Sequence, residues 1–174
     1  MSTGYSRSSI VPIIGGHASS GSLFTRPLVT CDLGPRKLVL MQPLEYRSSG
    51  IGIGESFFVP AGFVSDGASV PFPLRTFYPT HGKWLAPSVL HDYLYRFQPI
   101  SRPDADNIFY EAMMAVKMRR TAAWCFYHAV DRFGGFAWRS NKRKMINDDD
   151  AGWVIDVNKP DWWKKFQSKP ILAA

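Results

Sequence analysis

The chain has 174 residues and a formal net charge of +7, and 45% of its residues are hydrophobic and 20% charged. This is the composition of a globular domain with its own core, and it excludes a chain that is disordered throughout. No stretch approaches the ~20 apolar residues of a membrane span, so we expect a protein made in the cytoplasm without a signal peptide or transmembrane segment.

The sequence divides into a central region and two flanking segments. Residues 1–22 are rich in serine and glycine and are interpreted as a flexible N-terminal arm that orders only against another molecule. Residues 23–138 form the predicted α+β core domain. Residues 139–174 are rich in tryptophan and basic residues and are interpreted as a C-terminal arm. Because exposed tryptophans are costly, this arm is expected to pack on its own domain or on a neighbour.

The first half of the core region carries the signals of β-strands. Residues 28–33, 37–46 and 56–60 are short segments rich in branched and aromatic side chains, separated by Gly-Pro or Ser-Ser-Gly. They predict an antiparallel meander of three or four strands. The run that follows, residues 62–73, is a predicted loop because its glycines and prolines interrupt regular structure.

From Lys83 onward the hydrophobic period is helical. Three helices are expected, at about residues 86–97, 102–117 and 120–133, the last ending at Gly134. Ser101 and Asp104 match the capping box of the second helix. Its short connection to the first helix predicts that the two form an antiparallel pair.

The first predicted helix places His91 at the edge of its apolar stripe, where a side chain is half buried. At about 100° per residue, Tyr95 follows one turn later on the same face and Asp92 points about 100° away. A half-buried imidazole held by a carboxylate suits a general base, and Asp106, early in the second helix, is placed to supply that carboxylate. His91, Asp106 and Tyr95 are therefore the candidate catalytic residues.

Structural alternatives for these residues stay open on spacing alone. His91 fits a histidine at the border of the core, and Asp106 fits a favourable acid near a helix N-terminus. Asp92 and Arg96 have the spacing of a surface ion pair. Asp66 fits an Asx turn before Gly67, or it could join Asp92 as an oxygen ligand of a hard cation such as Ca²⁺.

The order of motifs resembles an uncharacterised domain family encoded by bacteriophages and prophages. The motifs are GFVSDGASVP, HDYLYR, SRPDADNIFYEAM and AVDRFGG, and the resemblance covers about residues 25–138. It implies a phage context. With the two arms, this context suggests a virion protein at the head-tail junction, tail or baseplate, present in several copies and docked on other phage structural proteins.

A second resemblance concerns the chemistry. The pattern HD-x-x-Y on one helix and AD-x-x-F on the next is similar to the core of phospholipase A2, especially the disulfide-free form in parvovirus capsids. This implies a calcium-dependent hydrolase of the host envelope, in which His91 activates water, Asp106 orients His91, Tyr95 supports them and Asp92 binds Ca²⁺. The glycine-rich calcium loop of those enzymes has no match, so GFVSDGASVP would have to replace it with another geometry.

The positive charge is concentrated in residues 117–120, 139–144 and 162–165. Such a field favours anionic lipid, nucleic acid or an acidic protein. A nucleic-acid-binding module ranks third among the functional hypotheses. Its support is the charge alone, since these runs lack the pattern of a recognition helix or a stacking platform for single strands.

Overall fold

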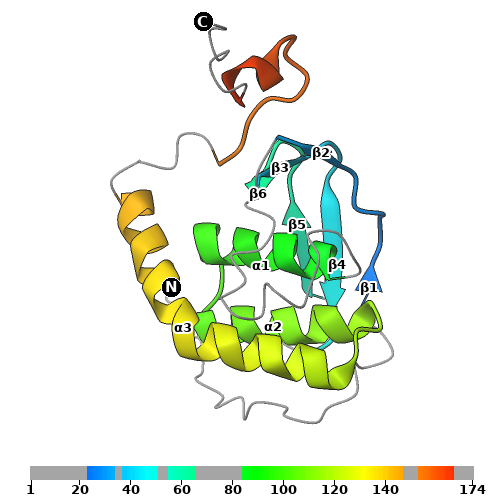
Figure 1. Ribbon diagram of the computed structural model, residues 1–174, viewed down its shortest axis with the longest axis vertical. Coiled ribbons are helices and arrows are strands. Elements are labelled where there is room, and N and C mark those ends of the chain that lie inside the picture. Colours follow the sequence, from blue (N-terminus) through cyan, green and yellow to red (C-terminus); the bar gives the residue numbers. More distant parts are fainter. Residues whose placement is uncertain (1–22, 34–36, 51–54, 66–83, 147–152, 167–174) are drawn as a thin grey trace, which may run out of the picture.

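The computed structural model describes residues 23–33, 37–50, 55–65, 84–146 and 153–166, and Figure 1 shows their arrangement. Short antiparallel strands precede three helices, so the predicted α+β fold is confirmed. The strands are β1 (Leu23–Phe24), β2 (Thr30–Asp32), β3 (Leu38–Leu40), β4 (Leu44–Ser48), β5 (Glu55–Val59) and β6 (Val64–Ser65). The helices are α1 (Leu85–Phe97), α2 (Arg102–Ala115), α3 (Arg120–Ile146) and the short 3-10 helix η2 (Trp162–Phe166).

The strands form two three-stranded antiparallel sheets with the orders β1-β4-β5 and β2-β3-β6. The segment 37–46, expected as one strand, is divided into β3 and β4 by a bend before Pro43. Proline has no N–H to donate to a ladder, so the chain can leave one sheet and enter the other at this point. Side chains alternate along β4, and those of Leu44, Tyr46 and Ser48 are buried.

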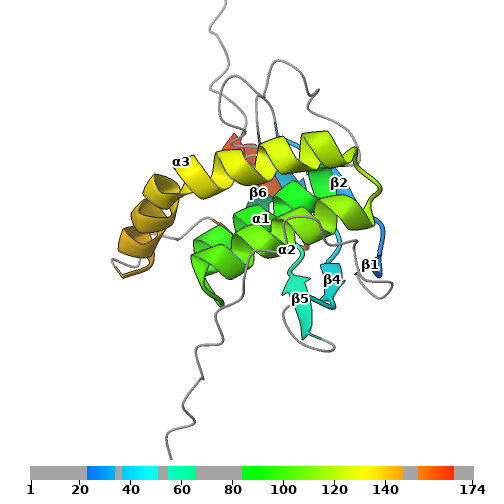
Figure 2. The same ribbon diagram turned by 90° about the horizontal axis from the view of Figure 1, so that it is seen from below.

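Helices α1 and α2 form the expected antiparallel pair, and α3 lies across both of them (Figures 1 and 2). The largest core cluster joins this pair to the strands through fully buried residues such as Leu90, Ile108 and Val59. A second cluster, which includes Trp84, Phe109 and Phe126, joins α3 to the pair. Both helices that carry the candidate catalytic residues are therefore held from two sides.

Helix α3 does not end at Gly134, as the sequence predicted, but continues to Ile146. A Cβ atom added at Gly134 would lie 2.4 Å from the hydroxyl oxygen of Tyr95, so the glycine is required for close packing between α3 and α1. Glycine is tolerated inside a helix at a cost of about 1 kcal/mol, which the contacts beyond it offset. The helix therefore crosses residue 138, where the sequence analysis placed the end of the core domain.

The segment after α3 returns to the core at residues 153–155. The backbone N–H of Val64 donates to the carbonyl of Trp153 at 2.8 Å, and that of Ile155 donates to the carbonyl of Gly62 at 2.9 Å. Gly62 has a φ of +83°, and a Cβ there would meet the Ile155 carbonyl at 1.8 Å, so a glycine is needed for this approach. Of the two alternatives left open for the C-terminal segment, its described part thus packs on its own domain. Residues 1–22 lie outside the described residues.

Glu111 of α2 connects the helix pair to the end of β4. Its carboxylate accepts hydrogen bonds from the Tyr46 hydroxyl at 3.1 Å, the Ser48 hydroxyl at 3.0 Å and the backbone N–H of Ser49 at 3.1 Å. Tyr46 and Ser48 are buried, so loss of the carboxylate would leave buried donors without this acceptor.

We expect Glu111→Ala to lower the free energy of unfolding by about 2 kcal/mol, which is the cost of leaving buried donors unsatisfied. Urea denaturation followed by circular dichroism measures the change. The control is Glu55→Ala, which removes an exposed carboxylate from β5. Equal unfolding midpoints for the two variants would contradict the role given to Glu111.

Candidate active site

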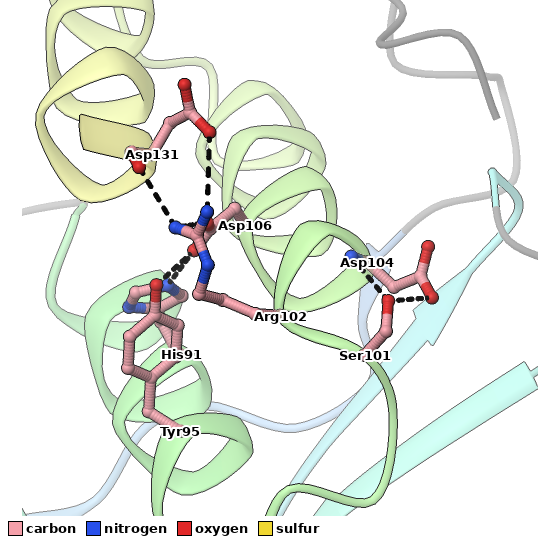
Figure 3. A network of polar contacts seen from close by, with 7 residues as sticks. All are labelled: His91, Tyr95, Ser101, Arg102, Asp104, Asp106 and Asp131. Carbon is pink, nitrogen blue, oxygen red and sulfur yellow. Dashed lines mark hydrogen bonds and ion pairs between the residues drawn. The ribbon is translucent and has the colours of Figure 1, made fainter. Parts of the chain in front are cut away.

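The candidate catalytic residues come together where the paired helices face each other (Figure 3). Helix α1 ends at Phe97 and is capped by Gln98, whose backbone is left-handed with a φ of 47°, and Ser101 caps the start of α2. The Ser101 hydroxyl donates to the Asp104 carboxylate at 2.6 Å. This short connection returns the chain beside α1, so Asp106 in the second turn of α2 faces His91 and Tyr95.

Asp106 is the centre of the polar network and is only 1% exposed. Its Oδ1 lies 3.0 Å from Nε2 of His91 and accepts a hydrogen bond from the Tyr95 hydroxyl at 2.6 Å. Its Oδ2 accepts from Nη1 of Arg102 at 3.2 Å. A buried carboxylate is tolerated when it is paired and hydrogen bonded, and here both of its oxygens have partners.

Arg102 extends the network to the third helix. Its Nη1 also donates to the backbone carbonyl of Asp131 at 2.9 Å, and its Nη2 lies 3.9 Å from the Asp131 carboxylate. The Arg102 side chain is 27% exposed, so the guanidinium covers the buried carboxylate from the solvent side. Asp106 is therefore fixed by contacts from α1, from its own helix and, through Arg102, from α3.

Tyr95 acts as a hydrogen-bond donor. Burial, together with the neighbouring Asp106 carboxylate, raises the pKa of its hydroxyl far above the ordinary value of 10.0. The protonated hydroxyl donates to Asp106, and the ring packs edge-on against Trp138 with 5.1 Å between centroids. The Tyr95 backbone carbonyl accepts from the Asn141 side chain at 3.2 Å. Contacts with α3 thus hold both ends of this residue.

The His91 ring is fixed in one orientation. It lies 4.5 Å from the Phe109 ring in a stacked arrangement and 4.2 Å from the Tyr95 ring, and the residue is 8% exposed. Because Nε2 faces a carboxylate oxygen, we assign the hydrogen of the neutral ring to Nε2. Within the described ranges Nδ1 has no hydrogen-bond partner. The nitrogen that can accept a proton is thus the one that Asp106 does not use.

Asp92 lies on another face of α1 and contacts β6. Its Oδ2 accepts a hydrogen bond from the hydroxyl of Ser65, the last residue of that strand. The Arg96 guanidinium, one turn later, donates to the carbonyl of Val64 and lies over the rings of Phe63 and Trp153. Asp92 is therefore fixed beside the last residue of β6.

Asp66, the second expected metal ligand, lies outside the described residues. In the described parts of the chain, no three His, Cys, Asp or Glu side chains are grouped as a metal site.

Sequence reasoning missed three residues that shape this site. Arg102 precedes Asp106 by four residues on the same face of α2, and this i, i+4 spacing was the signal available for their ion pair. Ser65 stands beside Asp66 in the GFVSDGASVP motif, but its contact with Asp92 depends on the packing of β6 on α1. Gly134 carries a signal that was interpreted as a helix end.

We predict that Gly134→Ala destabilises the protein, because the new methyl group would overlap the Tyr95 hydroxyl, which is held by Asp106. Overpacking of this kind costs about 1–3 kcal/mol. The matched control is Gly135→Ala, where the nearest atom to the added Cβ is Nη1 of Arg139 at 3.5 Å, so helix propensity should stabilise that variant. Thermal unfolding compares the two.

A Tyr95→Phe background tests the cause of this effect. It removes the hydroxyl that lies nearest to the added methyl group, so the cost of Gly134→Ala should shrink there. An unchanged cost in that background, or equal stability of the Gly134 and Gly135 variants, would show that the close approach does not matter.

Comparisons with known proteins give one match. A family model described as "Protein of unknown function (DUF1353)" matches residues 38–130, which is more than half of the 174 residues. The matched range contains the helix pair and its polar residues His91, Tyr95, Arg102 and Asp106. No curated protein matches the chain, and neither does any solved structure.

Proposed function

The chain belongs to DUF1353, a family of proteins of unknown function, and from the geometry of its site we propose that it is a hydrolase with His91 as the general base. The observation that carries the proposal is the 3.0 Å contact between His91 Nε2 and Asp106 Oδ1 in a buried setting. A carboxylate in this position fixes the tautomer and the orientation of the ring and stabilises the imidazolium that forms when the ring accepts a proton.

In the proposed reaction, a water molecule gives a proton to Nδ1 of His91 as its oxygen attacks the carbonyl carbon of an ester. The tetrahedral intermediate collapses, the alkoxide leaves, and the imidazolium returns the proton to it, so that ester and water give acid and alcohol. Asp106 offsets the transient positive charge on His91. Tyr95 and Arg102 are positioning residues, since both donate to the Asp106 carboxylate and neither takes part in the proton transfer.

A hard cation beside Asp92 belongs to the same proposal. Asp92 fits this role because its half-buried carboxylate contacts Ser65, the residue that precedes Asp66 in the sequence. Asp92 and Asp66, with backbone carbonyls of the loop predicted from the sequence at residues 62–73, would hold Ca²⁺. When bound, the ion supplies positive charge that stabilises an oxyanion. The proton transfer described above needs only His91 and Asp106.

The proposed substrate is the carboxylic ester of an anionic phospholipid in a bacterial envelope, cleaved during entry or lysis. Support comes from the resemblance of HD-x-x-Y and AD-x-x-F to the phospholipase core and from the net charge of +7.

The test incubates the purified chain with phosphatidylglycerol vesicles, with Ca²⁺ or with EDTA, and measures the release of fatty acid. Calcium-dependent release is expected, together with a higher melting temperature in Ca²⁺ that Asp92→Asn removes. If neither vesicles nor soluble nitrophenyl esters are hydrolysed in either condition, the hydrolase proposal is wrong. Hydrolysis that persists in EDTA would contradict only the proposed role of the cation.

The second candidate is a structural role in a bacteriophage virion, at the head-tail junction, tail or baseplate. One observation favours it. Phe58 is 53% exposed on β5, which is an edge strand of its sheet among the described strands. Edge strands with exposed apolar side chains pair readily with other chains. Mass spectrometry of purified particles of the encoding phage should find the chain in several copies. Its absence from the particles would exclude this role.

A further inference from the structure

Helix α3 exposes two phenylalanines one turn apart. Phe133 is 70% exposed and Phe136 is 77% exposed, the highest values among the large hydrophobic residues that the structure describes. Single exposed hydrophobic residues are ordinary, but two adjacent aromatic side chains this far in solvent indicate a contact surface.

Basic side chains surround this pair. Residues 132–146 contain five basic residues and no acidic one. At about 100° per residue, Arg132, Arg139 and Arg143 lie within about 60° of Phe136 around the helix, and Lys144 within about 80°. The surface formed by these six exposed side chains is called the α3 surface below: Arg132, Phe133, Phe136, Arg139, Arg143 and Lys144. Its four cations have no ion-pair partner within the described residues.

The opposite side of α3 is fixed to the rest of the domain, so the α3 surface is held outward. The Trp138 ring packs against Tyr95, and the Gln98 side chain donates to the Trp138 carbonyl at 2.8 Å. The Asn141 side chain donates to the Tyr95 carbonyl. These contacts prevent the helix from rotating to bury its phenylalanines against α1.

The combination of aromatic and basic side chains on one helix face matches an anionic lipid surface. Arginine and lysine attract anionic headgroups, while phenylalanine side chains gain by entering the region between headgroups and acyl chains. Duplex nucleic acid would satisfy the cations alone, since its bases are stacked inside the double helix and its phosphate backbone offers no apolar environment for Phe133 and Phe136.

We propose that the α3 surface docks the protein on an anionic membrane, with α3 parallel to the bilayer. Phe133 and Phe136 enter the interfacial region, and the four cations contact lipid phosphates. Docking uses none of the residues of the candidate active site, so the docking proposal can be tested independently of the proposed hydrolysis.

The test is co-sedimentation of the full chain with vesicles of phosphatidylglycerol and phosphatidylcholine, compared with phosphatidylcholine alone. Using His91→Gln throughout keeps the lipid intact, so binding is measured without hydrolysis. Binding should require phosphatidylglycerol and weaken with salt. The variants Phe133→Ser/Phe136→Ser and Arg139→Glu/Arg143→Glu should each lower the affinity by about tenfold or more.

Matched controls change the same chemistry elsewhere on the surface. Phe58→Ser removes an exposed phenylalanine from β5, and Lys37→Glu/Lys159→Glu reverses two exposed charges; both should bind nearly as the parent does. The single variant Phe136→Ser serves if a double variant fails to fold.

Three results would overturn the proposal: equal sedimentation with neutral and anionic vesicles, loss of binding in the controls as large as in the α3 variants, or binding to duplex DNA through the α3 surface without binding to vesicles. The last would identify a nucleic-acid interface instead.

Discussion

Replacing His91 by glutamine should abolish hydrolysis while the protein stays folded. Glutamine has a similar reach, and its amide can still donate to the Asp106 carboxylate, so the buried acceptor keeps a partner. It has no basic nitrogen, however, and loss of a general base lowers the rate by about 10²–10⁴-fold. Release of fatty acid from phosphatidylglycerol vesicles measures the loss, and circular dichroism checks the fold.

The control for this substitution is His128→Gln. His128 lies on α3, where its ring contacts Trp124 and Tyr127 and not Asp106. It should keep the activity of the parent chain. Equal rates for the His91 and His128 variants would show that His91 belongs to the structure alone, as one of the alternatives from the sequence holds.

Asp106→Ala should be strongly destabilising. It removes the acceptor shared by His91, Tyr95 and Arg102 at a position that is 1% exposed. Breaking a buried, hydrogen-bonded pair by removing one partner costs about 3–5 kcal/mol. Asp106→Asn should lower the free energy of unfolding less, because the amide oxygen can still accept a hydrogen bond. Some cost remains, since the NH₂ group then faces one of the former donors.

Urea denaturation measures both Asp106 variants against Asp104→Ala as the control. Asp104 stands at the start of the same helix, where its contact with Ser101 is worth about 1 kcal/mol. An Asp106→Ala variant no less stable than Asp104→Ala would mean that the network around Asp106 is not desolvated. The His91 and Asp106 substitutions thus separate two roles, since only the second should change stability strongly.

The meeting of His91 and Asp106 could be predicted because it depends on local rules. Helical periodicity places Tyr95 one turn after His91, and the capped start of α2 at Ser101 fixes where Asp106 lies along the second helix. A connection this short places the two helices side by side and antiparallel. The prediction that Asp92 points to another face of α1 also follows from the period, and the structure places Asp92 against β6.

The third helix shows where local rules stop. A Gly-Gly pair ends many helices, and nothing in the local sequence shows that Gly134 faces Tyr95 across a helix contact. That contact depends on how α3 crosses α1, which is set by clusters of residues far apart in the sequence, such as Trp84 with Phe126. The assignment of β3 and β4 to different sheets is likewise decided outside the segment itself, because β3 pairs with the non-consecutive strand β6 while β4 pairs with the next strand, β5.

The C-terminal segment illustrates the same limit. Its tryptophans indicated that it packs against another part of the protein or a neighbour. It packs along the edge of β6, where the absence of a side chain at Gly62 lets the backbone of Ile155 approach. The identity of that partner depends on a strand about 90 residues earlier, a separation at which sequence pattern carries no pairing signal.

The central claim, that Asp106 presents His91 as a base, can be tested without a known substrate. Long-range ¹H–¹⁵N correlation spectra of the histidine-labelled protein report which ring nitrogen carries hydrogen, and loss of a signal in His91→Gln assigns it. We predict that neutral His91 carries its hydrogen on Nε2 and none on Nδ1, and that Asp106→Ala mixes the two tautomers. A hydrogen on Nδ1 in the parent chain would contradict it, because that nitrogen could then not accept a proton from water.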